Sequence, residues 1–318
     1  MKFKATLSDR GLRVLEKGFL PTLEKFGKQC QLLMSPEDVH LIQTTLNADG
    51  LQITARLALE VLFEPSSYRV VSKHNNLIAF TVDLGLFLKV LRSAAQHEAD
   101  TLDIRLSMRK VPTSGDTAQQ ERPTLSCSWR GPNLQVLQDL PISRPCTASE
   151  VDQLVRQKEV GQLCPFYLDI QPEAQRIQAI VDKLKGVASD VTLAVTKQGD
   201  LHLQAATPGL HFSTELRGLE VLPAAVGQEA EPLRAPTAEG RLREAEQRPG
   251  DAAAVYMLVK HLGKALQSSQ LTAPAQLLLG IAENGGYAHM MFVHRDPFSD
   301  VGYDDNISLS YKLPVRDE

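Results

Sequence analysis

The stretch Arg176–Ala206, RIQAIVDKLKGVASDVTLAVTKQGDLHLQAA, shows the structural unit from which this chain is built. Four apolar residues recur there at helical spacing: Ile177, Ile180, Val181 and Leu184. Alternating apolar runs follow at 191–196 and 201–206. The stretch therefore predicts a helix that is basic along one edge, a short loop, and two strands joined by a turn. The hairpin contains no obvious catalytic residue, so the purpose of the basic helix beside it needs an explanation.

The same order of elements occurs earlier in the chain, from Val14 to Thr44. Three residues also match at equal spacing: Asp38 with Asp200, His40 with His202, and Leu41 with Leu203. Matching letters inside a shared order of elements indicate an internal duplication. We therefore predict an α+β fold of two similar domains, each with two helices packed on antiparallel sheet.

The predicted elements follow this repeat. Helices are expected at 8–28, 83–97, 171–186 and 258–270. Pro21 should kink or split the first helix, and Asp83 should cap the second. Strands are expected at 1–7, 31–34, 39–44, 51–59, 68–71, 77–82, 102–108, 124–129, 133–138, 166–170, 191–196, 201–206, 210–221, 252–257, 276–283, 287–294 and 306–315.

These elements divide the chain into an N-terminal domain, 1–138, and a C-terminal domain, 165–318. The proline-containing connector between them, 139–164, is predicted to hold one helical turn around 150–157. Residues 223–250 are rich in Ala, Glu, Pro and Gly and nearly lack large apolar residues, so we expect a disordered insertion there.

Composition limits the function classes. The chain has 318 residues, a net charge of −4 and only 5% aromatic residues, which argues against a base-stacking platform for single strands. The four cysteines are far apart and show no zinc spacing, so reduced thiols in an intracellular protein are expected. The charged, alternating start is unlike a signal peptide, and no apolar run approaches the ~20 residues of a membrane span.

The positive charge is concentrated on the predicted helices. Together they hold 12 Lys or Arg against 6 Asp or Glu, a net +6, so the remainder of the chain carries −10. Helical geometry gathers the cations on coherent faces, although on the third helix they flank the apolar stripe. Two explanations stay open: ordinary solvated helix faces, or a surface that follows a phosphate backbone without reading sequence. The candidate DNA-facing residues are Arg10, Arg13, Lys17, Lys28, Lys89, Arg92, Arg176, Lys183, Lys260 and Lys264.

Catalytic chemistry has no recognisable pattern in this sequence. The phosphate-binding loops GxxxxGK[ST] and GxGxxG are missing, as are HExxH and GxSxG. His40 and His202 lie in predicted strands, where a role in strand register is the simpler interpretation. Asp169, Glu173 and Asp182 are scattered and suggest no acid–base pair. We therefore expect no enzyme activity, no metal site and no cofactor.

Several segments resemble the Hus-one family, a subunit of the heterotrimeric nine-one-one DNA-damage checkpoint clamp. They are the start MKFKA, the helix LGLFLKVLRSA at 84–94, the segments from Pro172 through Leu184 and at 200–203, and ISLSYKLP at 307–314. The resemblance covers nearly the whole chain except 111–122, part of the connector and 223–250. It implies a PCNA-like sliding-clamp fold, in which helices line a central hole and sheets form the outer wall.

The resemblance also implies partners. Two other clamp subunits would close the ring with this chain, edge to edge, by strand pairing. A clamp-loader ATPase would load the ring onto double-stranded DNA without sequence specificity, and the ring would recruit repair enzymes. The resemblance places this activity in the nucleus. Two alternatives remain at this stage: a homotrimeric processivity clamp of the PCNA type, which would differ in its partner edges, and a nuclease on a related fold, which would need convergent carboxylates or a metal.

Overall fold

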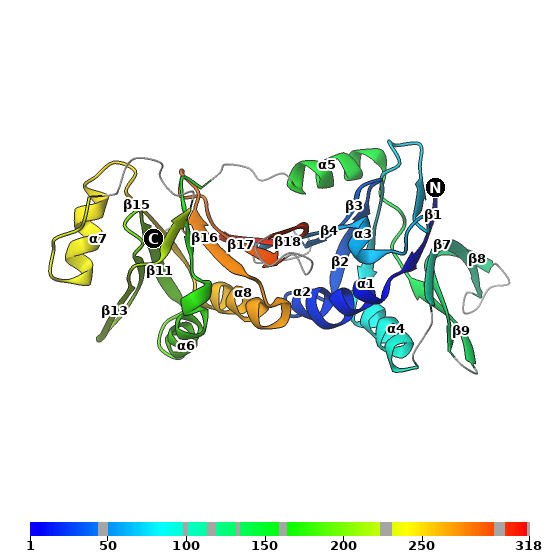
Figure 1. The fold of residues 1–318 in the computed structure, drawn as a ribbon, viewed down its shortest axis with the longest axis horizontal. Helices are drawn as coiled ribbons and strands as arrows, with labels where there is room; N and C mark the ends of the chain where they lie inside the picture. The colour runs from blue at the N-terminus through cyan, green and yellow to red at the C-terminus, as the bar shows by residue number, and fades with distance from the viewer. Residues whose placement is uncertain are drawn as a thin grey trace. The chain divides into compact units, whose positions relative to one another are not determined.

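Two compact units make up the structure, a computed structural model that describes residues 1–43, 50–97, 101–112, 119–131, 134–158, 164–222, 231–295 and 303–316. Apart from short segments, unit 1 contains the described residues up to 158 and unit 2 those from 164 onward. Figure 1 shows the elements of each unit.

The helices of unit 1 are α1 (Asp9–Arg13), the π-helix η1 (Val14–Phe19), α2 (Leu20–Glu24), α3 (Leu59–Leu62), α4 (Leu84–Gln96) and α5 (Ala148–Lys158). Its strands are β1 (Lys2–Leu7), β2 (Gln29–Met34), β3 (Asp38–Gln43), β4 (Gln52–Ala58), β5 (Arg69–Val71), β6 (Ile78–Asp83), β7 (Thr101–Pro112), β8 (Gln119–Gly131) and β9 (Leu134–Pro141).

The helices of unit 2 are the 3₁₀ turn η2 (Gln171–Glu173), α6 (Ala174–Leu184), α7 (Ala238–Glu246) and α8 (Val259–Thr272). Its strands are β10 (Tyr167–Asp169), β11 (Asp190–Thr196), β12 (Leu201–Thr207), β13 (Leu210–Leu216), β14 (Glu220–Leu222), β15 (Ala252–Leu258), β16 (Gln276–Ile281), β17 (Tyr287–Arg295) and β18 (Tyr303–Pro314).

The strand orders of the two units correspond strand for strand. In unit 1 they are β5-β1-β7-β8-β9 and β4-β3-β2-β6, and in unit 2 they are β14-β10-β16-β17-β18 and β13-β12-β11-β15. Each strand of unit 2 therefore takes the place of the strand nine positions earlier. The predicted duplicated α+β fold is confirmed, because only a repeated chain path reproduces both orders.

The first helical segment changes its winding in front of Pro21. The run from Asp9 to Glu24 passes from α-helix into a π-helical segment, where Leu20 N–H bonds to Leu15 C=O. Proline cannot donate a backbone hydrogen bond, so the π-helical segment is where the run accommodates it. The predicted helix at 8–28 is therefore interrupted, as expected, but it ends at Glu24 with Lys25 as its C-cap, and Lys28 lies outside it.

The other predicted helices form at the expected places. Asp83 caps α4, because its carboxylate accepts a 2.8 Å hydrogen bond from Leu86 N–H. The connector contains a full helix, α5, where one turn had been expected. Val151 and Leu154 of α5 are buried against Leu33 and neighbouring residues of unit 1, so this apolar contact explains the greater length of the helix.

The prediction of a disordered insertion at 223–250 is wrong for 231–250, and 223–230 lie outside the described residues. Helix α7 forms in this segment, with Thr237 as its N-cap accepting from Gly240 N–H. Leu242 and Ala245 are buried although the segment has few large apolar residues. Composition failed here because two apolar residues on one face, together with polar contacts to the sheet, are enough to hold the helix.

The described residues contain no helix that is long and apolar enough to cross a membrane. All four cysteines are free thiols, and Cys30, Cys127 and Cys164 are buried. Burial raises the pKa of Cys30 to about 12, which makes this thiol unreactive at neutral pH.

Candidate nucleic-acid interface

In unit 1, η1 and α2 pack against α4 (Figure 1). Arg92 Nε of α4 lies 3.9 Å from Glu16 Oε1 of η1, so the two helices also meet through opposite charges. Six residues of α4 are buried, whereas Leu86 is exposed. The buried residues are Leu84, Phe87, Leu88, Val90, Leu91 and Ala94. An amphipathic helix packed in this way must present its charged residues on the opposite side, to solvent.

The candidate cations of unit 1 follow this rule with one exception. Arg13, Lys17, Lys28, Lys89 and Arg92 are exposed, whereas Arg10 is half-buried. Arg10 therefore suits a phosphate contact less well than the other five. Lys25, which caps α2 and is also exposed, belongs to the same basic set and was missing from the prediction.

In unit 2, α6 packs against α8, and a glycine allows a lysine to lie between them. A Cβ on Gly263 of α8 would clash with Cε of Lys185 and would stand 3.1 Å from a methyl carbon of Val181. The lysine stem therefore lies across α8, and its ammonium group donates to Asp182 at 2.7 Å. Lys185 was also missing from the prediction, because only the packing of two helices reveals its position.

Arg176 and Lys183 of α6 face solvent more directly than the apolar stripe suggested. The buried side of α6 consists of Ala174, Ile177, Gln178, Val181 and Leu184. Ile180, which the stripe included, is only half-buried. The buried face is thus turned away from Arg176 and Lys183, which stand seven residues apart on the exposed side and not along its flank.

Lys260 and Lys264 are both exposed and lie one turn apart on α8. The buried side of this helix includes His261, Leu262 and Ala265. Residues four apart share a helix face, so the two lysines form a compact pair of positive charges. The structure therefore brings cations together on the paired helices of each unit. Long, exposed Lys and Arg side chains suit phosphate contacts, which need charge but little fixed geometry.

Two buried polar clusters occupy the four-stranded sheets. In unit 1, Arg56 Nε donates to Asp38 Oδ2 at 2.9 Å, and His40 Nε2 lies 3.1 Å from Oδ1. Ser35 donates to the same carboxylate at 2.7 Å. Burial opposes ionisation, but the contacts with His40, Arg56 and Ser35 together hold the pKa of Asp38 well below its usual range. This cluster is a satisfied ion pair in the sheet and resembles no catalytic arrangement.

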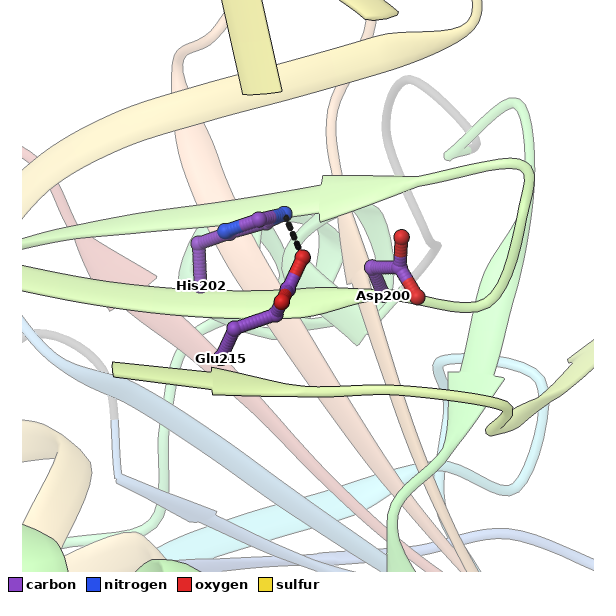
Figure 2. Close-up of side chains that lie close together, drawn as sticks. All are labelled: Asp200, His202 and Glu215. Atoms are coloured by element: carbon purple, nitrogen blue, oxygen red, sulfur yellow. Dashed lines mark ion pairs between the residues drawn. The ribbon is translucent and has the colours of Figure 1, made fainter. Parts of the chain in front are cut away.

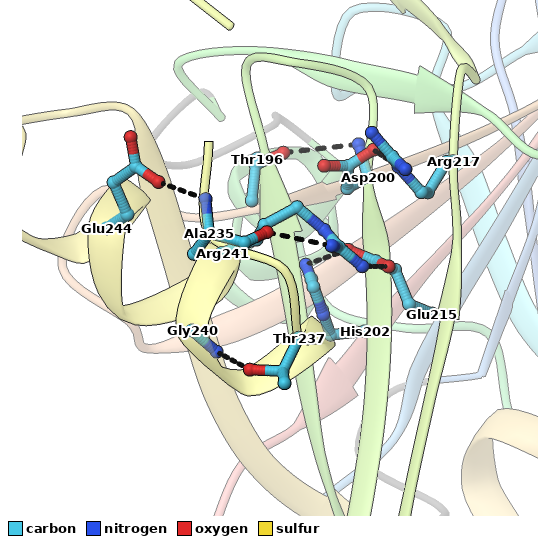
Figure 3. A network of polar contacts seen from close by, with 10 residues as sticks. All are labelled: Thr196, Asp200, His202, Glu215, Arg217, Ala235, Thr237, Gly240, Arg241 and Glu244. Carbon is cyan, nitrogen blue, oxygen red and sulfur yellow. Dashed lines mark hydrogen bonds and ion pairs between the residues drawn. The ribbon is translucent and has the colours of Figure 1, made fainter. Parts of the chain in front are cut away.

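The cluster in unit 2 joins Asp200, His202 and Glu215 (Figure 2), whose potential ligand atoms lie within 4.8 Å of one another. Figure 3 shows that α7 supplies the counter-charge: the Arg241 guanidinium donates to both Glu215 carboxylate oxygens, one of them at 2.8 Å. Arg217 Nε lies 3.9 Å from Asp200. The guanidinium of Arg241 thus holds the carboxylate that a metal ion would need, so this trio is better described as an ion-pair cluster.

Ionisation in this cluster follows from burial and charge. Burial lowers the pKa of His202, while the hydrogen bonds from Arg241 lower that of Glu215. Burial, followed by the nearby charge of Glu215, raises the pKa of Asp200. No sequence motif marked Arg241 or Glu215, because they come from segments far apart and one of them lies in the supposed insertion.

Comparisons with known proteins agree with this architecture. The profile of the Hus1-like protein family matches residues 1–316. Checkpoint protein hus1 from Schizosaccharomyces pombe is 28% identical over 224 residues, covering 69% of this chain and 71% of that protein. PCNA from Thermococcus kodakaraensis has a TM-score of 0.58 and 18% identity, covering 99% of this chain and all of the other. PCNA from Entamoeba histolytica has a TM-score of 0.58 and 10% identity, covering 99% of each chain.

Proposed function

This chain belongs to the Hus1-like protein family, and from that premise we propose that it is a non-enzymatic subunit of a DNA-damage checkpoint clamp that encircles DNA. The sliding-clamp fold of the PCNA structures supports this proposal, as does the resemblance noted from the sequence. The chain then acts by holding DNA and recruiting other proteins, without chemistry of its own.

The observation that carries the proposal is the distribution of charge on the duplicated fold. An acidic protein of net charge −4 presents cations on paired helices in both units. Of the candidates, nine are exposed: Arg13, Lys17, Lys28, Lys89, Arg92, Arg176, Lys183, Lys260 and Lys264. Sequence-independent binding to a phosphate backbone requires this kind of surface, which supports a duplex held against the helices.

Partner subunits would pair with the outer strands of the sheets. β9 ends the five-stranded sheet of unit 1, and β13 ends the four-stranded sheet of unit 2. Leu134 and Leu137 of β9 are 47% and 52% exposed, which is unusual for an edge strand that meets only water. We assign these two edges to contacts with two different clamp subunits. We further propose that a clamp-loader ATPase loads the ring onto DNA, that the ring recruits repair enzymes, and that it acts in the nucleus.

The homotrimeric PCNA-type clamp is the competing assembly. The PCNA structures share the fold with this chain at 18% and 10% identity, and membership in the checkpoint family favours a heterotrimer. Sizing of the purified full chain separates the two: a stable self-trimer would contradict the heterotrimer.

The test of DNA contact is the double variant Lys260→Glu and Lys264→Glu in the assembled ring. Each lost phosphate contact should lower the slope of log affinity against log salt by about 1, so we expect a decrease of about 2 for linear duplex DNA. The control carries the same charge change at two other exposed cations of unit 2, Arg243→Glu and Arg295→Glu. If both variants give the same slope as the unmodified ring, α8 does not face the DNA.

A further inference from the structure

A row of three positive charges spans β5, β1 and β7, three strands of the five-stranded sheet of unit 1. Strand pairing sets Lys4 of β1 directly opposite Arg69 of β5 on one side and Arg105 of β7 on the other. All three side chains are exposed. Within the described part of the chain, none of the three makes an ion pair or a side-chain hydrogen bond.

This row lies on the face of the sheet that points away from the helices. Phe3 of β1 and Ile104 of β7 line the apolar core of unit 1 together with Leu15 of η1 and Phe87 of α4. Side chains alternate between the two faces along a strand, so Lys4 and Arg105, the next residues along, point to the opposite face.

Such a row costs folding free energy. Like charges directly opposite on neighbouring strands repel each other and destabilise the sheet. A second like pair, Arg109 opposite Arg122, extends the basic strip between β7 and β8. Arg109 is balanced by Asp139 at 2.7 Å. Asp103 lies on the same face as the row but is bound by the Thr6 hydroxyl at 2.6 Å, and no carboxylate of the described residues makes an ion pair with Lys4, Arg69 or Arg105.

Unit 2 shows that the fold itself does not need these cations. The corresponding strands, β14, β10 and β16, contain no Lys or Arg. Their pairing brings Leu222, Tyr167 and Gly280 into one row. The same architecture is therefore built without any positive charge at the equivalent place, so the basic row of unit 1 calls for a functional explanation.

We propose that the outer sheet face around Lys4, Arg69 and Arg105 binds the phosphodiester backbone of a second duplex DNA segment, outside the ring. The inference rests on the proposed function, because it adds an outer contact to a clamp whose helices hold DNA inside. Point charges on an open sheet suit phosphates, which need no pocket. The three strands offer no exposed aromatic side chain for base stacking, and this favours duplex over single-stranded DNA.

The experiment uses closed circular duplex DNA and the assembled ring without clamp loader. A closed ring cannot thread onto a circle without ends, so binding reports on the outer surface alone. The variant is Lys4→Gln, Arg69→Gln and Arg105→Gln. Three lost phosphate contacts should lower the salt slope by about 3. The matched control removes three exposed cations elsewhere, Arg156→Gln, Arg234→Gln and Arg243→Gln, and should leave the slope nearly unchanged.

A second measurement separates binding from folding. Removing the repulsion should raise the urea midpoint of the triple variant while its DNA affinity falls, a combination that misfolding cannot produce. The proposal is overturned if the triple variant has the same salt slope on duplex circles as the unmodified ring. It is also overturned if the variant loses binding only to single-stranded circles, or only to an acidic peptide used as a second probe. The Lys260 and Lys264 test on linear DNA is independent, so either result can fail alone. If no ring assembles, the same comparison is made with the full chain by itself.

Discussion

The two units build their polar clusters from the same sequence spacing but with opposite charges across the strands. In unit 1, the residue opposite His40 is Arg56, and it pairs with Asp38 within the sheet. In unit 2, the residue opposite His202 is Glu215. The sheet of unit 2 therefore has an extra buried acid where unit 1 has a cation, and its counter-charge must come from elsewhere.

That counter-charge is Arg241, and it explains why α7 is ordered. In each unit a helix outside the repeat packs on the face of the four-stranded sheet that carries the histidine. α5 does so through apolar contacts on Leu33, and α7 does so through the pair of Arg241 and Glu215 together with the buried Leu242 and Ala245.

The largest expected effect is that of Arg241→Ala. It leaves Glu215 buried without its partner, a change that costs about 3–5 kcal/mol of unfolding free energy. The matched change in unit 1, Arg56→Ala, should cost about 1 kcal/mol, because Arg56 is 41% exposed and Asp38 keeps Ser35 and His40. Urea denaturation measures both. Equal costs would show that the two clusters do not differ in the way described.

The next effect concerns the apolar contact of α5. Leu154→Ala leaves a cavity among buried residues and should cost about 2–3 kcal/mol. Hydrogen exchange should then increase throughout α5. The matched change Leu242→Ala should leave most of α7 protected, because Arg241 still holds Glu215. If α7 loses its protection as completely as α5, the ion pair is not the main anchor of α7.

The smallest effect is a difference in acid sensitivity. Burial, followed by the charge of Lys312, lowers the pKa of His289 in unit 2 from 6.5 to about 4. Between these values the unfolded chain binds the proton and the folded chain does not, so stability falls as pH decreases below 6.5. The loss should reach about 2 kcal/mol by pH 5. In unit 1 the low pKa of Asp38 gives stability that is lost only below about pH 4.

His289→Gln should flatten the pH dependence of the unfolding free energy between pH 6.5 and 5, measured by urea denaturation at several pH values. Gln keeps a polar group near the Tyr167 hydroxyl, which lies 2.9 Å from His289 Nδ1, without titrating in this range. An unchanged slope in the variant would mean that another group is responsible for the acid sensitivity.

Sequence reasoning identified the four repeated helices, most of the strands and the duplication, because each depends on local periodicity or on a repeated order. It also placed nine of the ten candidate cations on exposed positions, since an amphipathic helix shows its charged face directly in its spacing. It was wrong about 231–250, because composition does not reveal that Glu215, far away in the chain, requires Arg241.

By itself the sequence determined the repeated order of elements, the excess of positive charge on the helices and the resemblance to a checkpoint clamp. These properties are local, or they add up along the chain. Only the tertiary structure decided that Lys185 lies across Gly263, that Arg241 neutralises Glu215, and that Lys4 stands between Arg69 and Arg105. The physical reason is strand register and helix packing, which bring distant residues together and which no short window of sequence encodes.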